Sequence, residues 1–238
     1  MDKKYNNTFD VIVVGSGNGG MTAAITAHDQ GLKVLLIEKS NLYGGTSATS
    51  GGGVWIPNNR YAKEVKADDS IEDARNYIKH VSPKGKIKPD LIETYLNKGP
   101  EMINFLHENS RVKYETLEHY PDYFPDDPGG KTGHRSMEPV PIYGNLLGSD
   151  FNKLRDQHVQ TKGPFGINFT QVEGQILLGA LSGWISLFIK LFFKYIFDFP
   201  YRLTNTRDRR LTMGNAGIAR LRLSLKDRNI PLWLNTSF

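Results

Sequence analysis

The sequence predicts an α/β fold built on a Rossmann-type, doubly wound sheet, and three features near its start predict it. The apolar run Val11–Val14 is typical of a short buried strand, because continuous β-branched residues suit a sheet covered on both faces. The turn Gly15–Gly20 then has the spacing G-x-G-x-x-G, and the Ala-rich segment Met21–Gln30 has helical character. Lys33–Ile37 is a second apolar strand. Strand, glycine turn, helix and strand follow in the order of a dinucleotide-binding βαβ unit.

Three glycines of this turn have an expected physical role. Gly15 permits the tight turn, Gly17 lets a pyrophosphate approach the backbone, and Gly20 lets the helix lie close to the strand. The positive end of the helix dipole faces the phosphates. Glu38 directly follows the second strand, about 20 residues after the glycines, where an acidic residue that bonds a ribose hydroxyl is expected. A strand–turn–helix that binds nothing is the alternative interpretation.

Composition sets limits on the class of protein. The chain has 238 residues, a net charge of +5 and no cysteine, which excludes a disulfide framework and thiolate catalysis. Its Lys and Arg are spread along the chain, so we expect no nucleic-acid partner. The polar N-terminus shows no signal-peptide pattern, and the six histidines show no metal-ligand spacing. We therefore expect a cytoplasmic protein without a metal site.

A second glycine-rich block, GGTSATSGGG, occupies Gly44–Gly53. Mixtures of Gly, Ser and Thr are usually flexible linkers. This block lies between the acidic residue Glu38 and the apolar segment Val54–Pro57, however, and a linker has little reason to follow a βαβ unit so closely. We interpret it as a segment that lines a ligand.

These segments resemble a known family. GSGNGG, EKS and GGTSATSGGGVWIPNN are similar to the FAD-binding start of the fumarate reductase/succinate dehydrogenase flavoprotein superfamily, and VWIPNN is most similar to the 3-ketosteroid dehydrogenases. The resemblance implies FAD as the cofactor and places Glu38 at the adenosine ribose. The FAD contacts that the resemblance implies are Gly15, Ser16, Gly17, Gly19, Gly20, Glu38, Lys39, Gly45, Thr46, Ser47, Ser50, Gly51 and Gly52.

The middle of the chain is predicted to be a helical and loop insertion. A capped helix starts at Asp69–Asp73, a second starts at Asp90, and Pro100 opens a third. We expect a FAD-binding βαβ core over residues 1–66, a helical region with an apolar helix over residues 67–210, and a return to the FAD-binding domain over residues 211–238.

An aromatic loop, Tyr114–Pro139, follows these helices. Its ring side chains are equally consistent with surface packing. The string PDYFPDDPGG within it resembles the family segment that carries an active-site tyrosine, and the matching position is Tyr123. A phenol at this position can donate a hydrogen bond to a substrate carbonyl and so favour removal of a neighbouring proton.

Gln175–Pro200 is an unusually apolar stretch. Polar residues recur in it every four residues, at Ser182, Ser186, Lys190, Lys194 and Asp198, which predicts a helix with one narrow polar stripe. Its uncharged run is about 21 Å long as a helix, short of the roughly 30 Å hydrocarbon core. We expect residues 176–199 to contact the membrane surface, with a helix packed on the protein body as the alternative.

The last segment predicts a return to the sheet. Ile218, Leu221 and Leu225 mark a helix that ends near Asn229, and Pro231–Leu234 reads as the next strand. The resembled family continues for about as many residues again, with further active-site tyrosines. We therefore expect an N-terminal portion that is inactive alone.

The resemblance implies a FAD-dependent oxidoreductase that introduces a ring double bond into an apolar, steroid-like substrate by proton abstraction and hydride transfer to flavin. A fumarate-type reductase is one alternative, with His134 and Arg135 as the best candidates for binding a carboxylate. A non-catalytic FAD-binding or membrane-surface remnant is the other.

Overall fold

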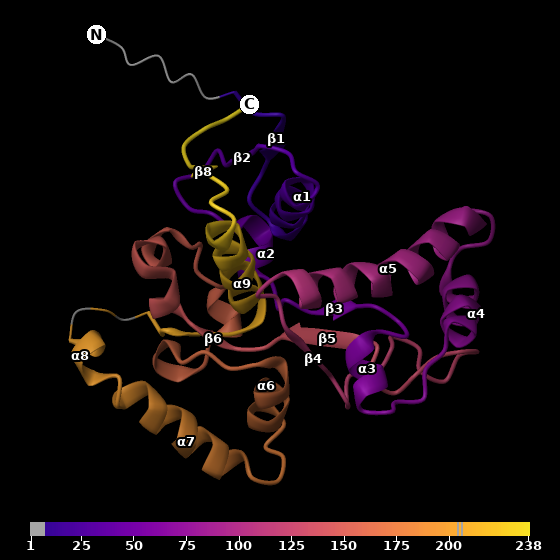
Figure 1. Ribbon diagram of the computed structural model, residues 1–238. Coiled ribbons are helices and arrows are strands. Elements are labelled where there is room, and N and C mark those ends of the chain that lie inside the picture. Colours follow the sequence, from indigo (N-terminus) through magenta and orange to yellow (C-terminus); the bar gives the residue numbers. More distant parts are fainter. Residues whose placement is uncertain (1–7, 204, 206) are drawn as a thin grey trace.

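A three-stranded parallel sheet forms the upper part of the molecule in Figure 1. The computed structural model describes residues 8–203, 205 and 207–238. The sheet has the order β1 (Val11–Val14), β2 (Val34–Ile37) and β8 (Leu232–Trp233), and both pairings are parallel. The βαβ unit and the returning strand expected from the sequence are therefore confirmed, and with them the α/β class.

Two helices pack together beside this sheet. Helix α1 (Asn18–Asp29) crosses from β1 to β2, and its residues Met21 and Ile25 are fully buried. Helix α9 (Met213–Asp227) contacts α1 and leads into β8. It ends at the predicted place, where Asn229 takes a left-handed backbone conformation with φ of 55°.

Strand β1 is less buried than its sequence predicts. Ile12 is 56% exposed and Val14 is 60% exposed, whereas all four residues of β2 are buried. Successive side chains of a strand point to opposite faces. Val11 and Val13 pack against the core, and among the described residues the other face of β1 remains open. The expectation of a strand covered on both faces is thus wrong for β1.

A second, antiparallel sheet lies to the right in Figure 1, with the order β3 (Val54–Trp55), β5 (Ser136–Pro139) and β4 (Tyr114–Thr116). Three helices accompany it: α3 (Arg60–Glu64), α4 (Ile71–Val81) and α5 (Pro89–Asn109). The predicted start of α4 is confirmed, because the Ser70 hydroxyl accepts a hydrogen bond from the Asp73 N–H at 3.0 Å.

Helix α5 corrects two expectations. It begins at Pro89, so Asp90 lies in its first turn and is not its cap, and it continues through Pro100 as one helix. A proline inside a helix removes one backbone hydrogen bond. Apolar residues on both sides of Pro100 share one buried face, which keeps the helix continuous. These residues are Ile92, Leu96, Ile103 and Leu106.

The third part of the fold lies at the lower left of Figure 1. Its strands β6 (Ile142–Tyr143) and β7 (Arg210–Leu211) pair antiparallel. Short 3₁₀ turns within residues 144–166 follow β6. Its helices are α6 (Gln171–Leu178), α7 (Trp184–Ile196) and α8 (Phe199–Arg202).

The apolar stretch is two helices rather than one. Ala180 and Gly183 take positive φ values of 46° and 84°, and this left-handed backbone separates α6 from α7. Of the predicted polar stripe, only Ser186, Lys190 and Lys194 therefore lie on one helix, α7. Among the described residues no helix combines the length and the apolar character that crossing a bilayer requires.

Candidate functional site

The glycine turn between β1 and α1 has the geometry that its spacing predicts. Gly15 has a φ of 95°, a conformation that favours glycine, and its N–H donates to the Ile37 carbonyl at 2.8 Å. A Cβ placed on Gly20 would lie 1.9 Å from the Gly15 carbonyl oxygen. Only glycine fits at this position, and the start of α1 is therefore held directly against the turn.

Glu38 is buried beside this turn, with 8% exposure. Its Oε2 accepts hydrogen bonds from the Ser16 N–H at 3.1 Å and from the Ser16 hydroxyl at 2.5 Å, and its Oε1 accepts from the Ser40 N–H at 3.0 Å. Burial alone would raise the pKa of Glu38, but these hydrogen bonds and the charge of Arg155 lower it overall. The side chain is thus a fixed carboxylate that ties the end of β2 to the turn.

The second glycine block lies against the first. Within it, residues Gly45–Thr49 form the short helix α2. The Ser47 hydroxyl accepts a hydrogen bond from the Asn18 N–H, at the start of α1, at 3.1 Å. A Cβ placed on Gly17 would lie 3.2 Å from the same hydroxyl oxygen. The block is therefore a packed segment of the fold, and the linker interpretation is wrong.

Helix α9 closes the other side of the block. A Cβ on Gly214 would lie 2.0 Å from the Ser47 carbonyl oxygen, and one on Gly52 would lie 2.5 Å from the Gly214 nitrogen. The fully buried Asn215 donates to the Ala48 carbonyl at 2.6 Å. Sequence reasoning missed Gly214 and Asn215. The small residues at the start of α9 were the available signal, but nothing local indicates what they pack against.

The predicted cofactor residues thus form one continuous region. Gly15, Ser16, Gly17, Gly19 and Gly20 form the turn and the first turn of α1. Glu38 and Lys39 follow β2, and Lys39 is exposed. The remaining predicted residues belong to α2 and the segment after it; they are Gly45, Thr46, Ser47, Ser50, Gly51 and Gly52.

A pocket of about 670 Å³ connects this region to the aromatic loop. It is lined on one side by the glycine segment 50–53 and on another by the loop segment 120–124, which includes Tyr123. Tyr123 is 95% exposed. The structure therefore brings the predicted tyrosine to the same pocket as Ser50, Gly51 and Gly52.

A buried ion network holds the loop in place. Arg135, with 1% exposure, donates to the Asp122 carboxylate at 2.7 Å and to Asp69 Oδ1 at 2.8 and 3.0 Å. The Trp55 indole N–H donates to the other Asp122 oxygen at 2.6 Å. The Arg135 guanidinium also lies 5.7 Å from the centroid of the Tyr77 ring. Because these internal partners occupy Arg135, it does not fit the role of a clamp for a substrate carboxylate.

The site fits a dinucleotide. Gly17 and Gly20 carry no side chains, and a Cβ at either position would meet neighbouring atoms. No side chain at these positions therefore covers the start of α1, where backbone N–H groups favour phosphate. Glu38 lies at the end of the neighbouring strand, as in ribose-binding βαβ units. The fold and this site define an α/β dinucleotide-binding domain with a second glycine segment folded against the first.

Comparison with known proteins identifies the family. The model of the FAD binding domain family matches residues 10–238, so the chain belongs to that family, and FAD is its cofactor. This confirms the resemblance and the cofactor that the glycine segments suggest.

Two of the most similar proteins are steroid dehydrogenases. The chain is 38% identical over 232 residues to 3-oxosteroid 1-dehydrogenase from Mycolicibacterium smegmatis. This match covers 96% of this chain and 39% of the relative. It is 43% identical, with a TM-score of 0.90, to 3-ketosteroid delta1-dehydrogenase from Sterolibacterium denitrificans, solved in complex with 1,4-androstadiene-3,17-dione; 97% of this chain and 41% of that one are covered. A flavocytochrome c3 fumarate reductase shares the fold at 16% identity and a TM-score of 0.55. The chain spans about 40% of the length of the dehydrogenases that it matches.

Proposed function

We propose that this chain is the FAD-binding portion of an oxidoreductase that introduces a double bond into the ring of a 3-ketosteroid. The observation that carries the proposal is the pocket in which the glycine segment 50–53 meets the loop of Tyr123. The similarity to 3-ketosteroid delta1-dehydrogenase over 97% of the chain supports this choice of substrate class. Because the chain spans about 40% of such relatives, we also propose that residues outside this sequence complete the active site.

The thirteen predicted cofactor residues hold FAD in this proposal. The turn Gly15–Gly20 and the start of α1 bind the pyrophosphate, and Glu38 accepts a hydrogen bond from the adenosine ribose. Ser47 and the segment Ser50–Gly52 lie beside the rest of the cofactor. When bound, FAD supplies the acceptor for a hydride.

Tyr123 polarises the substrate ketone. Its hydroxyl donates a hydrogen bond to the carbonyl oxygen, which makes a proton on the neighbouring carbon easier to remove. The pocket suits an apolar substrate, because Trp55, Tyr77, Ile78 and Phe124 line it. The ion pair between Arg135 and Asp122 fixes the loop next to Tyr123, whose side chain lines the same pocket as the glycine segment.

A carboxylate-reducing enzyme is less well supported. Such an enzyme needs cationic side chains that face its substrate, and the best candidate, Arg135, is buried and bound to Asp69 and Asp122. The similarity to a fumarate reductase, at 16% identity, extends to the fold alone.

The catalytic proposal is tested with FAD, 4-androstene-3,17-dione and an artificial electron acceptor, with the chain supplemented by the C-terminal portion of a relative. We expect 1,4-androstadiene-3,17-dione as the product. Tyr123→Phe removes one hydroxyl and should lower the rate by about 10²-fold or more. Tyr120→Phe, in the same loop, is the matched control. Equal rates for both variants would remove Tyr123 from the mechanism, and failure to bind the steroid would overturn the substrate class.

We further propose that α7 contacts a membrane surface. Its Leu187, Leu191 and Phe192 pack towards the buried residues Ile167, Phe169 and Met213 of the protein body. The opposite face carries an exposed stripe with side chains between 41% and 56% exposed, formed by Ile185, Ile189, Phe193 and Ile196. The helix thus combines both alternatives left open by the sequence, packing on the body and presenting an apolar face.

Vesicle flotation tests this contact. Ile185→Ser together with Ile189→Ser should weaken vesicle binding by at least about tenfold, because the two side chains lose apolar area that would enter the lipid. The control pair Val65→Ser and Leu91→Ser changes apolar residues of similar exposure elsewhere, one directly after α3 and one in α5. If both pairs behave like the unchanged chain, α7 is not the contact.

A further inference from the structure

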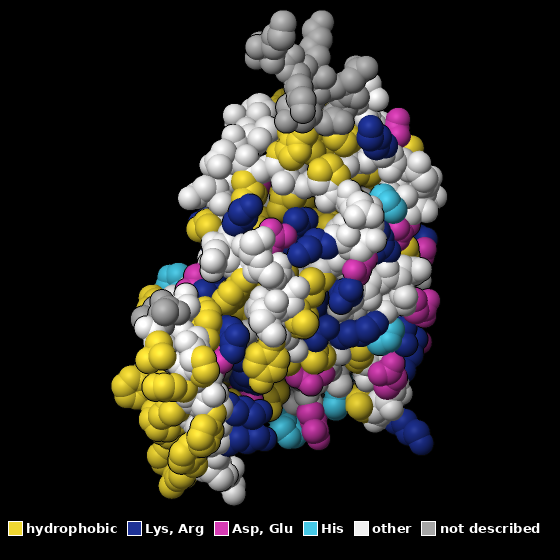
Figure 2. Space-filling view, turned by 60° about the vertical axis from the view of Figure 1, so that its left-hand side comes forward, with side chains coloured by type: hydrophobic (Ala, Val, Ile, Leu, Met, Phe, Trp, Pro, Cys, Tyr) yellow, Lys and Arg dark blue, Asp and Glu magenta, His cyan; other side chains and the backbone are white. Residues whose placement is uncertain are grey.

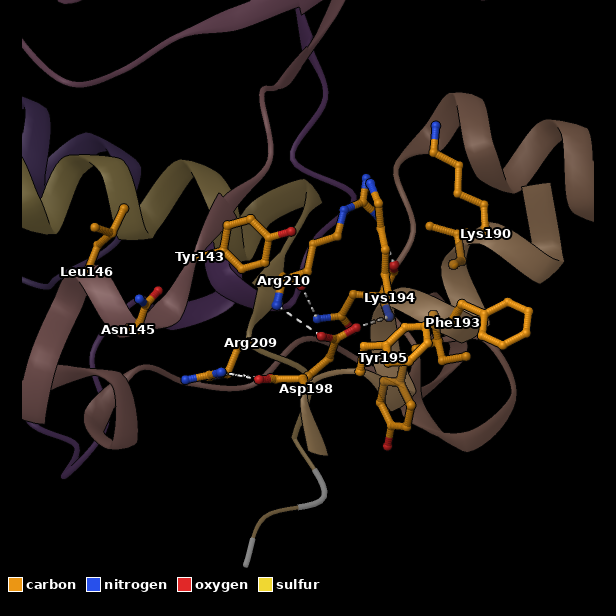
Figure 3. Close-up of a pocket in the computed structure, with 15 residues that line it drawn as sticks. Tyr143, Asn145, Leu146, Lys190, Phe193, Lys194, Tyr195, Asp198, Arg209 and Arg210 are labelled. Carbon is orange, nitrogen blue, oxygen red and sulfur yellow. Dashed lines mark hydrogen bonds and ion pairs between the residues drawn. The ribbon is translucent and has the colours of Figure 1, made fainter. Parts of the chain in front are cut away.

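A pocket separate from that of Tyr123 opens beside the exposed stripe of α7. It has a volume of about 660 Å³ and lies between α7 and the strands β6 and β7. Figure 3 shows Tyr143, Asn145 and Leu146 on one side of it and Lys190 and Lys194 of α7 on the other, with Arg209 and Arg210 nearby. None of these residues belongs to the proposed FAD or steroid site.

The charge of this pocket is positive. Four cationic side chains line it, Lys190, Lys194, Arg209 and Arg210, against two carboxylates. Both arginines already have carboxylate partners, since Arg209 donates to Asp198 at 2.7 Å and Arg210 binds Glu173 through two hydrogen bonds of 2.8 Å. The ammonium groups of Lys190 and Lys194 have no hydrogen-bond or ion-pair partner within the part of the chain that the structure describes. Two exposed ammonium groups are therefore available for an external anion.

The two lysines are placed next to the apolar stripe. Each follows a stripe residue by one position, Lys190 after Ile189 and Lys194 after Phe193, so both lie along one flank of the stripe. Figure 2 shows a large yellow apolar area at the lower left of the surface, with dark blue cationic side chains along its edge. A helix that rests on a bilayer by its stripe would bring both ammonium groups to the depth of the lipid headgroups.

We propose that the pocket between α7 and the β6–β7 pair binds the phosphate of an anionic phospholipid, with Lys190 and Lys194 as its ligands. The inference rests on the proposed membrane contact and adds its chemical preference. The apolar stripe supplies binding to any bilayer, and the lysine pair selects bilayers that carry negative headgroups. A soluble phosphate compound has the same charge but cannot use the stripe, so the bilayer is the occupant that satisfies both features.

Flotation of the purified chain with two kinds of vesicle tests the proposal. One kind is phosphatidylcholine alone, and the other contains about one third phosphatidylglycerol. We expect tighter binding to the anionic vesicles, and we expect Lys190→Gln with Lys194→Gln to weaken that binding by about 30-fold, since each lysine near an anionic surface contributes about fivefold. Binding of the double variant to phosphatidylcholine should remain unchanged. The control Lys84→Gln with Lys86→Gln removes the same charge from an exposed loop and should have little effect.

The outcomes separate this inference from the membrane contact on which it rests. Equal binding to both vesicles, or equal losses for the two lysine pairs, would overturn the lysine site while the membrane contact stands. No flotation with either vesicle would overturn the contact itself. Self-association through α7 in the absence of vesicles, measured by ultracentrifugation, would show a second copy as the occupant and would also overturn the proposal.

Discussion

The closest packing at the dinucleotide turn gives a sharp prediction for Gly20→Ala. The new Cβ would lie 1.9 Å from the Gly15 carbonyl oxygen, so the start of α1 must move away or the turn must deform. Forcing one carbon into a packed site typically costs about 1–3 kcal/mol. Alanine regains up to about 1 kcal/mol of helix propensity. Since the overlap is with backbone, which cannot rotate aside, we expect a net loss of about 1–2 kcal/mol in the free energy of unfolding.

Gly19→Ala is the matched control. Gly19 belongs to the same turn of α1, and a Cβ placed on it meets nothing within 4 Å. Alanine at this position should leave the free energy of unfolding unchanged or raise it by up to about 1 kcal/mol. Urea unfolding followed by far-UV circular dichroism measures both variants with comparable m-values. If Gly20→Ala proves as stable as Gly19→Ala, the helix is not held against the turn and the reasoning fails.

Three further substitutions test neighbouring contacts. Glu38→Gln removes a charged acceptor of three hydrogen bonds and should lower the free energy of unfolding by about 1.5–3 kcal/mol at pH 7, measured by urea unfolding. Because the pKa of Glu38 is lowered, the unchanged chain should keep this contribution until the pH falls through that lowered value. Arg135→Met leaves Asp122 buried without its partner and should cost about 3–5 kcal/mol, and a loss below about 1 kcal/mol would contradict the network. Burial and the charges of Lys113 and Arg60 lower the pKa of His107, whose Nδ1 lies 2.8 Å from the Tyr61 hydroxyl. The free energy of unfolding should therefore fall as the pH drops below about 6.5 and through the lowered pKa. His107→Gln should show a smaller loss between pH 7.5 and pH 5, and an equal loss would exclude His107 as the cause.

Local sequence patterns predicted the parts of the site that local chemistry determines. The βαβ unit, the role of Gly20 and the place of Glu38 all depend on residues within a span of about 28 positions, where spacing alone fixes the geometry. The second glycine block is not a linker, because Ser47 within it accepts a hydrogen bond from Asn18, whereas its role in lining a ligand stays a prediction.

Long-range contacts account for what the sequence did not predict. Gly214 packs against Ser47 although more than 160 positions separate them in the sequence, and Arg135 binds Asp69 at a separation of 66 positions. No local pattern therefore predicts either contact. The continuity of α5 through Pro100 likewise depends on the buried face that the helix shares with its neighbours. The division of the chain after residues 66 and 210 stays a prediction.

We propose above all that the two glycine segments together form one binding site for FAD. Titration of the purified chain with FAD and, separately, with NAD, followed by calorimetry, tests it most directly. We predict that the chain binds one FAD and has little affinity for NAD, and that Gly17→Val, which would fill the space between α1 and Ser47, abolishes FAD binding. A chain that unfolds cooperatively and yet binds no FAD, or that prefers NAD, would contradict the claim.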